Sequence, residues 1–387
     1  MEEHKDFIIE NARIVTPAGI LEGASAIVCE GRLHKIREGS IPNGGERLDA
    51  GGGWLLPGFI DMHSDALEKD LEPRPNALFP LDIVVCELDK KLAACGVTTT
   101  YHSISFAENE IGVRSNTMAA EIITKVHHAA KRLHVRTKIH ARFEITDGAA
   151  LPRLESLLGA GKIHLLSLMD HTPGQGQFRE VLAFKNYYQA VYRKNDEEIK
   201  KIIDRKVNAR RFVKGHVDHI TRLCRSLSIP MASHDDDCRE KIEWLSEQHI
   251  RISEFPVNME TVQAARGKGL FVCLGAPNIV RGNSQSRNLS ARDAISAGCG
   301  DIICSDYAPM AMLHAVFTLD RLKLLPLHEA VNMTSLHPAR ALGLANETGS
   351  LEEGKLADLV IVKNGDGIPR IMKTFVEGRE VFSTWLR

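Results

Sequence analysis

Residues 58–76 read GFIDMHSDALEKDLEPRPN, an apolar run that ends in His63 and Asp65 and continues into a stretch with Lys69 and Arg74. Side chains two positions apart on a strand point to the same face, so a strand through this run brings His63 and Asp65 together. Imidazole and carboxylate groups suit a divalent metal ion, and the two cations beyond them suit an anion. Taken alone, an H-x-D pair is more often a hydrogen-bonded surface pair, so a metal site needs support from other strand ends.

The composition of the 387-residue chain predicts a large globular protein of the cytoplasm. Hydrophobic residues make up 43% of it, enough for a large core, and no run is long enough to cross a membrane. A formal net charge of −1 argues against a general nucleic-acid or membrane-surface binder. The N-terminus has no apolar signal segment, and the eight cysteines are scattered without C-x-x-C pairs, as expected of reduced thiols. We expect a small-molecule partner, no nucleic acid and no membrane, and leave a homo-oligomer open.

The order of apolar and turn-rich segments predicts an α/β fold, a (β/α)8 barrel of TIM type with a small β domain formed by both termini. Residues 1–56 and 346–387 hold short β-like runs separated by turn residues, whereas 57–345 alternates apolar strands with helical segments. Barrel strands are predicted near 58–63, 97–104, 138–145, 163–169, 229–234, 251–257, 270–275 and 301–305. Helices are predicted around 82–95, 115–134, 195–227, 237–248, 260–268, 289–297 and 326–343. In such a barrel, catalytic groups lie at the C-terminal ends of the strands.

Five of the eight predicted strands end in groups that can bind a metal ion. These groups are His63 and Asp65, Glu144, Asp170 with His171, His234, and Asp306. Singly, each has a structural explanation, such as an ion pair or a helix cap. Together, carboxylates buried at one rim would repel one another unless cations neutralise them. The mixture of imidazole and carboxylate, without thiolate, predicts a metal site of His63, Asp65, Glu144, His171, His234 and Asp306 with one or two divalent ions, zinc first and Mn²⁺ or Fe²⁺ as alternatives.

Basic side chains are predicted at the same rim. The segment after the seventh strand, GAPNIVRGNSQSRN, carries Arg281 and Arg287, and the loops after strands seven and eight of barrels commonly hold phosphate. Arg142 comes from the third strand, and Lys69 and Arg74 follow the first. Any one of them is equally well explained as a solvated side chain. Five cations around a metal centre favour a polyanionic substrate, whose phosphates they would bind.

Longer motifs resemble a known family. GWLLPGFIDMHSD at the start of the predicted barrel and LEEGKLADLVIV near the end of the chain resemble the amidohydrolase superfamily. LEKDLEPRPN, SLMDHTPGQGQF, ASHDDD, SEFPVN, LGAPNIVRGNSQS and SDYAP are similar to its phosphonate-metabolism branch, and the similarity runs along nearly the whole chain. The resemblance implies hydrolysis of a ribose 1-phosphonate 5-triphosphate to the 5-phosphate and pyrophosphate, in phosphonate catabolism, rather than cleavage of an amide.

Several positions depart from the family pattern. Asp65 stands where the superfamily usually has the second histidine of an H-x-H pair. In the superfamily, a carboxylated lysine on the fourth strand usually bridges two metal ions. In this chain we assign that bridging role to Glu144. In the strand-seven loop, Gln285 and Arg287 replace a histidine and a glycine of the branch. The loop changes affect the expected substrate more than the reaction type.

The expected mechanism is metal-assisted hydrolysis of a phosphoric anhydride. The bound ion lowers the pKa of a water, Asp306 orients that water and accepts its proton, and the basic residues neutralise the charge that develops on phosphate. Two alternatives stay open. A C–N hydrolase or deaminase on the same fold would use the metal ligands but leave the arginines idle. A catalytically inactive barrel acting as an assembly subunit would need neither the metal ligands nor the arginines.

Overall fold

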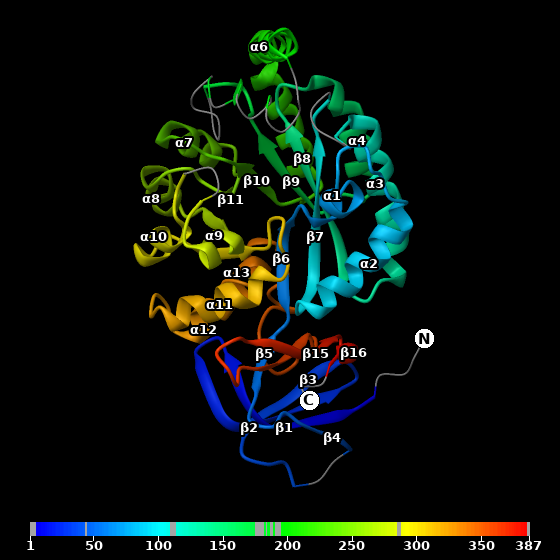
Figure 1. Ribbon diagram of the computed structural model, residues 1–387, viewed down its shortest axis with the longest axis vertical. Coiled ribbons are helices and arrows are strands. Elements are labelled where there is room, and N and C mark those ends of the chain that lie inside the picture. The colour runs from blue at the N-terminus through cyan, green and yellow to red at the C-terminus, as the bar shows by residue number, and fades with distance from the viewer. Residues whose placement is uncertain are drawn as a thin grey trace.

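The computed structural model describes residues 5–42, 45–108, 114–174, 182, 184–185, 189, 195–284 and 288–384. Within these ranges the chain forms a parallel sheet that curves into a barrel and a second sheet at one end of it (Figure 1). Strands from both ends of the chain build the second sheet. The TIM-type barrel and the small β domain formed by both termini, predicted from the sequence, are confirmed.

In the described part of the chain, eight parallel strands form the barrel, each beside its predecessor. They are β6 (Phe59–Ser64), β7 (Val97–Phe106), β8 (Arg136–Glu144), β9 (Leu165–Met169), β10 (Met231–His234), β11 (Ile252–Glu254), β12 (Phe271–Gly275) and β13 (Ile302–Cys304). Every residue of β6 and β7 is buried, because a parallel strand inside a ring of helices is covered on both faces. The ring closes where Ser64 pairs in parallel with Asp306. There the Asp306 amide donates to the His63 carbonyl at 3.0 Å, and the Asp65 amide donates to the Asp306 carbonyl at 2.7 Å.

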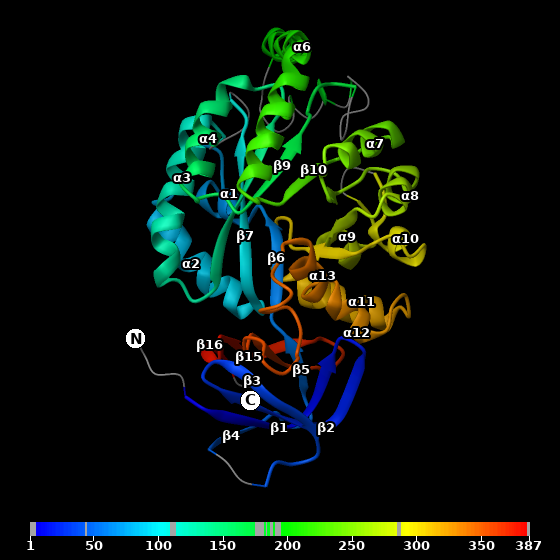
Figure 2. The same cartoon turned by 180° about the vertical axis from the view of Figure 1, so that it is seen from behind.

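Helices cover the outside of the barrel (Figures 1 and 2). Between the strands these are α1 (Ala66–Leu71), α2 (Leu81–Ala94), α3 (Asn116–Ala129), α4 (Leu151–Gly159), α6 (Asp196–Ser226), α7 (Arg239–Glu247), α8 (Met259–Gly267), α9 (Ala276–Arg281) and α10 (Ala291–Ser296). After β13 come α11 (Ala311–Arg321), α12 (Leu327–Asn332) and α13 (Leu336–Ala341). The long helix α6 begins at a capping box, in which Asn195 and Glu198 satisfy each other's backbone amides. Among the helices described, we find none with both the length and the apolar character needed to span a bilayer.

The second sheet has the strand order β16-β15-β14-β5-β1-β2-β3, with β4 beside β1. Its strands are β1 (Phe7–Thr16), β2 (Gly19–Cys29), β3 (Arg32–Glu38), β4 (Glu46–Asp49), β5 (Trp54–Pro57), β14 (Leu359–Lys363), β15 (Arg370–Val376) and β16 (Arg379–Ser383). β5 lies between the two ends of the chain, parallel to β1 and antiparallel to β14. Gly58 then leads into β6, and a Cβ at this position would collide with Thr98 of β7. The small domain is thus joined closely to the first barrel strand.

The interior of the barrel is apolar at one end and polar at the other. On β8, Ile139, Ala141 and Phe143 belong to the core beneath the helices, and the alternate residues point into the barrel. Ile60, Tyr101, Leu165, Ile252 and Ile302 are among the side chains that fill one interior cluster, together with Ala339 and Leu342. In Figure 1, β6 runs from the small domain into the barrel. The C-terminal ends of the barrel strands therefore point away from the small domain.

Candidate active site

The predicted metal ligands lie at the C-terminal end of the barrel. His63 is on β6, Glu144 and His234 end β8 and β10, and Asp65, His171 and Asp306 follow β6, β9 and β13 closely. This is the end at which barrel enzymes carry their catalytic groups. The side chains form two neighbouring clusters.

The first cluster is built around His63, whose side chain is fully buried. Its Nε2 lies 3.6 Å from Oδ1 of Asp65, and its Nδ1 lies 3.0 Å from Oε1 of Glu254. The His63 ring lies 5.4 Å from the ring of His234 and 4.9 Å from that of Phe255, measured between centroids. Burial lowers the pKa of His63, but Glu254 and Asp65 outweigh it and raise this pKa to about 10. The imidazole is therefore held in a strongly anionic environment.

Arg142, also in this cluster, joins two candidate ligands from different strands. Its Nη1 donates to both carboxylate oxygens of Asp65, at 3.0 and 3.1 Å, and its Nη2 donates to Nε2 of His234 at 3.1 Å. Because a guanidinium only donates, Nε2 of His234 is the unprotonated nitrogen. Burial raises the pKa of Asp65, but the charge of Arg142 outweighs it and holds this pKa well below the usual range. A residue predicted to bind phosphate thus lies among the predicted metal ligands.

Asp306 is held beside this cluster by the backbone. Its φ is +55°, which is uncommon outside glycine, and its amide and carbonyl both hydrogen-bond to the end of β6. Burial, and then the negative charge of Asp65, raise the pKa of Asp306 to about 7. A carboxyl with a pKa near neutrality can take up and release a proton under ordinary conditions.

Glu144 and His171 form the second cluster with Lys206, which α6 contributes. Nδ1 of His171 and Nζ of Lys206 each lie 3.1 Å from Oε2 of Glu144, and Thr146 donates to Oε1 at 2.8 Å. Burial raises the pKa of Glu144, but Lys206, His171 and Thr146 together outweigh it and hold this pKa well below the usual range. Asp235 connects the two clusters electrostatically, because the charges of His234 and His171 both lower its pKa.

The sequence analysis missed three buried residues of the site. His140, on β8, and Glu254, at the end of β11, form with His63 a group whose possible metal-binding atoms all lie within 4.8 Å of one another. Lys206 comes from the middle of a long helix, where nothing in the sequence marks it. Glu254 lies inside the predicted strand 251–257 and not at its end, whereas in the structure it is the last residue of β11. His140 alternates with Arg142 and Glu144 along β8, so period-two spacing would have placed it on the same face.

The other predicted phosphate-binding residues are at the surface. Lys69 on α1, Arg74 in the segment after it, and Arg281 at the end of α9 are all exposed. The segment after β12, expected as a loop, begins with the short helix α9, so Arg281 lies one and a half turns from the strand end. Arg287 lies outside the described residues, as does Gln285.

The first cluster has the chemistry of a divalent metal site. Nε2 of His63 is buried and has no hydrogen-bond partner among the residues described. Two ligands of a tetrahedral zinc ion, with bonds of about 2.1 Å, are about 3.4 Å apart. The 3.6 Å between Nε2 of His63 and Oδ1 of Asp65 is close to that spacing. Asp306 adds an oxygen donor, and His234 a second imidazole.

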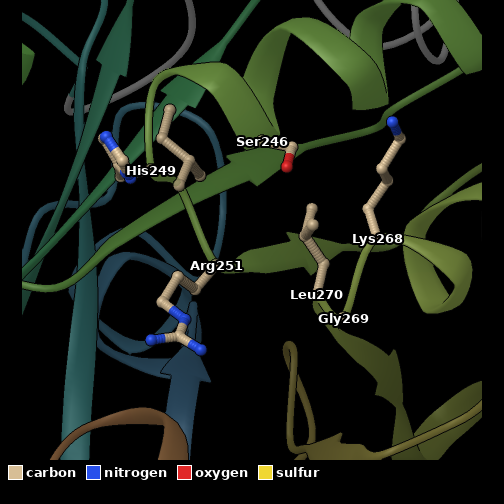
Figure 3. Close-up of a pocket in the computed structure, with 7 residues that line it drawn as sticks. Ser246, His249, Arg251, Lys268, Gly269 and Leu270 are labelled. Carbon is tan, nitrogen blue, oxygen red and sulfur yellow. The ribbon is translucent and has the colours of Figure 1, made fainter.

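A shallow pocket of about 260 Å³ lies elsewhere on the barrel (Figure 3). It is lined by Ser246, His249, Ile250, Arg251, Lys268, Gly269 and Leu270. These residues belong to the C-terminal part of α7 and to the segments that lead into β11 and β12. The pocket is therefore at the N-terminal ends of the strands, at the opposite end of the barrel from the metal-binding groups.

A barrel with histidines and carboxylates at these strand ends is typical of one class of hydrolases, the amidohydrolases, and the comparisons identify the same family. The amidohydrolase family profile matches residues 188–381. The chain belongs to the amidohydrolase family. It is 33% identical over 382 residues to the alpha-D-ribose 1-methylphosphonate 5-triphosphate diphosphatase of Escherichia coli, an alignment that covers 97% of this chain and 100% of that protein. The resemblance found in the sequence is confirmed.

More distant relatives share the architecture. The imidazolonepropionase of Thermoplasma volcanium is 22% identical over 405 residues, covering 95% of this chain and 96% of that protein. The crystal structure of N-acetylglucosamine-6-phosphate deacetylase from Pasteurella multocida has a TM-score of 0.65 at 14% identity, covering 97% of this chain and 99% of that chain. The crystal structure of dihydropyrimidinase from Brevibacillus agri has a TM-score of 0.58 at 14% identity, covering 98% of this chain and 95% of that chain. At these identities, the two structures establish the fold alone.

Proposed function

We propose that the protein is a metal-dependent hydrolase of a phosphoric anhydride, which cleaves a ribose 1-phosphonate 5-triphosphate to the 5-phosphate and pyrophosphate. The observation that carries this proposal is the full-length relation to the Escherichia coli diphosphatase, at 33% identity over 97% of the chain. The first cluster supports it, because metal-binding side chains lie against a buried arginine there. Hydrolysis of a polyphosphate needs both kinds of group.

One or two divalent ions are part of this proposal, with zinc as the first choice. His63, Asp65, His234 and Asp306 would hold an ion in the first cluster, and Glu144 and His171 are the candidates in the second. When bound, the ion lowers the pKa of a water and neutralises phosphoryl oxygens. Imidazole and carboxylate ligands without thiolate are compatible with Mn²⁺ and Fe²⁺ as well.

Asp306 is the residue assigned to proton transfer. Its pKa of about 7 allows the carboxylate to accept a proton from an attacking water near neutral pH. Two backbone hydrogen bonds to β6 fix its position relative to His63 and Asp65. The carboxylate therefore needs little reorganisation before the reaction.

We assign the cations around the site to binding of the substrate's phosphate groups. Arg142 is buried, at 4% exposure, and contacts Asp65 and His234 directly. Lys69, Arg74 and Arg281 come from segments that follow β6 and β12, and as exposed side chains they are able to reorient toward a substrate. Arg287 is assigned by its sequence position alone. Charge-assisted hydrogen bonds from these groups would stabilise the charge on a transferring phosphoryl group.

The alternative is hydrolysis of a C–N bond, which the imidazolonepropionase relation favours. The two reactions are separated by a substrate screen of the purified, metal-loaded protein. Ribose and nucleoside triphosphates are assayed for release of pyrophosphate, beside a panel of N-acyl and amidine substrates assayed for C–N cleavage. Chelator-treated protein is the control. Pyrophosphate release that depends on the ion supports the proposal, and C–N cleavage alone would replace it.

A further inference from the structure

The two ring nitrogens of His63 have different surroundings. Nδ1 lies 3.0 Å from Oε1 of Glu254 in hydrogen-bond geometry. Because a carboxylate at neutral pH only accepts, the proton of this bond is on Nδ1 of His63. Nε2 has no hydrogen-bond partner among the described residues, and it lies 3.6 Å from Asp65. The atom of His63 that is available to an ion is therefore Nε2.

Glu254 is buried behind His63, and a second residue faces it from further inside the barrel. Both Glu254 and His140 are 0% exposed. Nε2 of His140 lies 3.7 Å from Oε2 of Glu254, and Nδ1 of His140 lies 3.2 Å from Oγ of Ser103. A chain of polar groups thus runs from Ser103 through His140 and Glu254 to His63. The chain ends at Nε2 of His63, which faces Asp65.

The same three residues permit two interpretations, and the distances decide between them. If Glu254 and His140 were ligands of an inner ion, His63 would be the third ligand, and Nδ1 is the nitrogen of His63 that faces Glu254. At 3.0 Å from Oε1, however, that nitrogen is already engaged in a hydrogen bond with Glu254. Only His140 and one oxygen of Glu254 would then remain, whereas protein zinc sites usually have three or four protein ligands.

The end of β11 is shaped to hold His63 in place. Phe255, the next residue, has a φ of +52°, a conformation that costs energy for a bulky side chain. Its ring packs edge-on against His63, with centroids 4.9 Å apart, and against His234 at 5.1 Å. Consecutive residues therefore contact His63 from two sides, through a carboxylate and through an aromatic wall.

We propose that Glu254 is a positioning residue, which accepts the Nδ1 proton of His63 and so directs Nε2 of His63 toward the ion. Nε2 of His140 faces the second oxygen of Glu254 at 3.7 Å, without a direct hydrogen bond between them. This inference rests on the metal dependence given under the proposed function, but not on the identity of the substrate. Carboxylate–histidine–metal arrangements of this kind fix the tautomer and orientation of the ligand, and their loss typically costs about 10- to 100-fold in metal affinity.

The test is a metal titration of the apo-protein, which requires no substrate. Zn²⁺ affinity is measured by competition with a chromophoric chelator, the number of bound ions by elemental analysis, and ligand geometry by the absorption of the Co²⁺ form. Glu254→Met removes the acceptor, whereas Glu254→Gln removes the charge and keeps an oxygen. Asp89→Asn is the matched control, because Asp89 is a buried carboxylate on α2 that bonds to the amides of His134 and Val135.

The proposal predicts a graded result. Glu254→Met should weaken Zn²⁺ binding about 10- to 100-fold and alter the Co²⁺ spectrum, and Glu254→Gln should weaken it by about threefold to tenfold. The number of ions at saturation should stay that of the wild type, and Asp89→Asn should bind as the wild type does. Loss of a whole ion in both variants would overturn the proposal and make Glu254 a ligand. Unchanged affinity in the folded Gln and Met variants would also overturn it, while absence of ion binding by the wild type would remove the proposed function as well.

Discussion

Arg142 bonds Asp65 and His234 at the same time, and this single side chain connects the two sets of residues that the sequence assigned to metal and to phosphate. Sequence positions alone placed His63, Asp65, His234 and Asp306 at one rim, because strand ends of a barrel converge. They do not reveal which side chains pair across the barrel. That pairing depends on residues far apart in the chain, such as Arg142 and His234, and on the depth of each side chain. Glu254 was missed because β11 ends three residues before the predicted strand 251–257 does, and His140 was missed although its spacing along β8 places it on the face of Arg142 and Glu144.

Replacement of Arg142 should separate metal binding from phosphate binding. Arg142→Met removes charge-assisted hydrogen bonds worth roughly 1.5–3 kcal/mol, so kcat/KM for a triphosphate should fall about 10- to 150-fold. Ion affinity should not fall, because a positive charge beside the ligands has been removed. Lys at this position should restore only part of the activity, since it lacks the planar fork. Kinetics and zinc titration of the two variants check this, and loss of the ion in Arg142→Met would mean that Arg142 is structural.

The exposed arginines provide a second comparison. Arg74→Met and Arg281→Met should each lower kcat/KM for a triphosphate by about 10- to 150-fold if they reach the phosphates. If the two arginines are only solvated surface residues, each substitution should change kcat/KM for a triphosphate by less than about threefold. Paired assays with a triphosphate and a monophosphate distinguish these results. If both variants keep full triphosphate activity, the phosphate-binding role passes from these two residues to Arg142.

Asp306 should matter more for rate than for ion retention. Asp306→Asn keeps the size and one oxygen of the side chain, so the ion should largely remain while kcat falls by about 10²- to 10⁴-fold, the usual range for loss of a general base. Steady-state kinetics and elemental analysis of the same preparation measure both quantities. His234→Ala is the comparison variant, in which ion and activity should be lost together. Equal ion loss in the two variants would make Asp306 purely a ligand, without the role of the base.

Among the elements, the eight barrel strands were predicted to within a few residues, because most of their residues are buried between the barrel interior and the helices. The helices α1, α4, α9 and α11 were not predicted. α11 reads AMLHAVFTLDR and is buried on nearly all sides, so it lacks the polar face that gives a helix its periodicity. α9 begins with Ala-Pro and ends at Gly282, and these residues are as typical of a turn as of a short helix.

The helix α6 contributes a buried charge to the site, and its energetic role is testable. Lys206 is 3% exposed, and its Nζ lies 3.1 Å from Glu144. Lys206→Met should destabilise the protein by about 3–5 kcal/mol, because it leaves a buried carboxylate without this cation. The double variant Lys206→Met/Glu144→Gln should recover much of the loss. Chemical denaturation of the wild type, the two single variants and the double variant gives the coupling free energy between Lys206 and Glu144. If the two substitutions had additive effects on the free energy of unfolding, the pairing would be contradicted.

In the whole molecule, the small β domain lies at one end of the barrel (Figure 1). The candidate metal ligands lie at the C-terminal ends of the barrel strands, away from that domain. Both termini contribute to one sheet, which was foreseeable because β-like runs occur at both ends of the chain. The order of strands within that sheet was not foreseeable. It depends on β5 pairing with β1 and β14 at once, a non-local arrangement that no segment specifies by itself.

Global stability should fall as the pH is lowered below neutrality. His164, which precedes β9, accepts the amide hydrogen of Ile139 on Nδ1, and burial, then Lys138 and His127, lower its pKa to about 4. An unfolded histidine has a pKa of about 6.5. Between these values the unfolded chain binds a proton that the folded chain does not. The stabilisation is therefore complete above about pH 6.5 and is lost as the pH falls toward 4.

His164→Asn isolates this contribution, because an asparagine oxygen accepts the same amide hydrogen without titrating. The slope of unfolding free energy against pH should be smaller than that of the wild type by up to about 1.4 kcal/mol per pH unit between pH 6.5 and 4. Denaturation curves at a series of pH values give the slopes. Identical slopes for the two proteins would show that His164 titrates normally in the folded state.

Hydrolysis of a phosphoric anhydride by the metal-loaded barrel can be followed in a single experiment. The purified protein is loaded with Zn²⁺ or Mn²⁺ and given a ribose 1-phosphonate 5-triphosphate, and the phosphorus products are resolved by ³¹P NMR. We predict stoichiometric pyrophosphate and the ribose 5-phosphate, formed only with the ion and not by the Asp306→Asn variant. An intact triphosphate in the metal-loaded reaction, together with turnover of a C–N substrate by the same sample, would contradict the account.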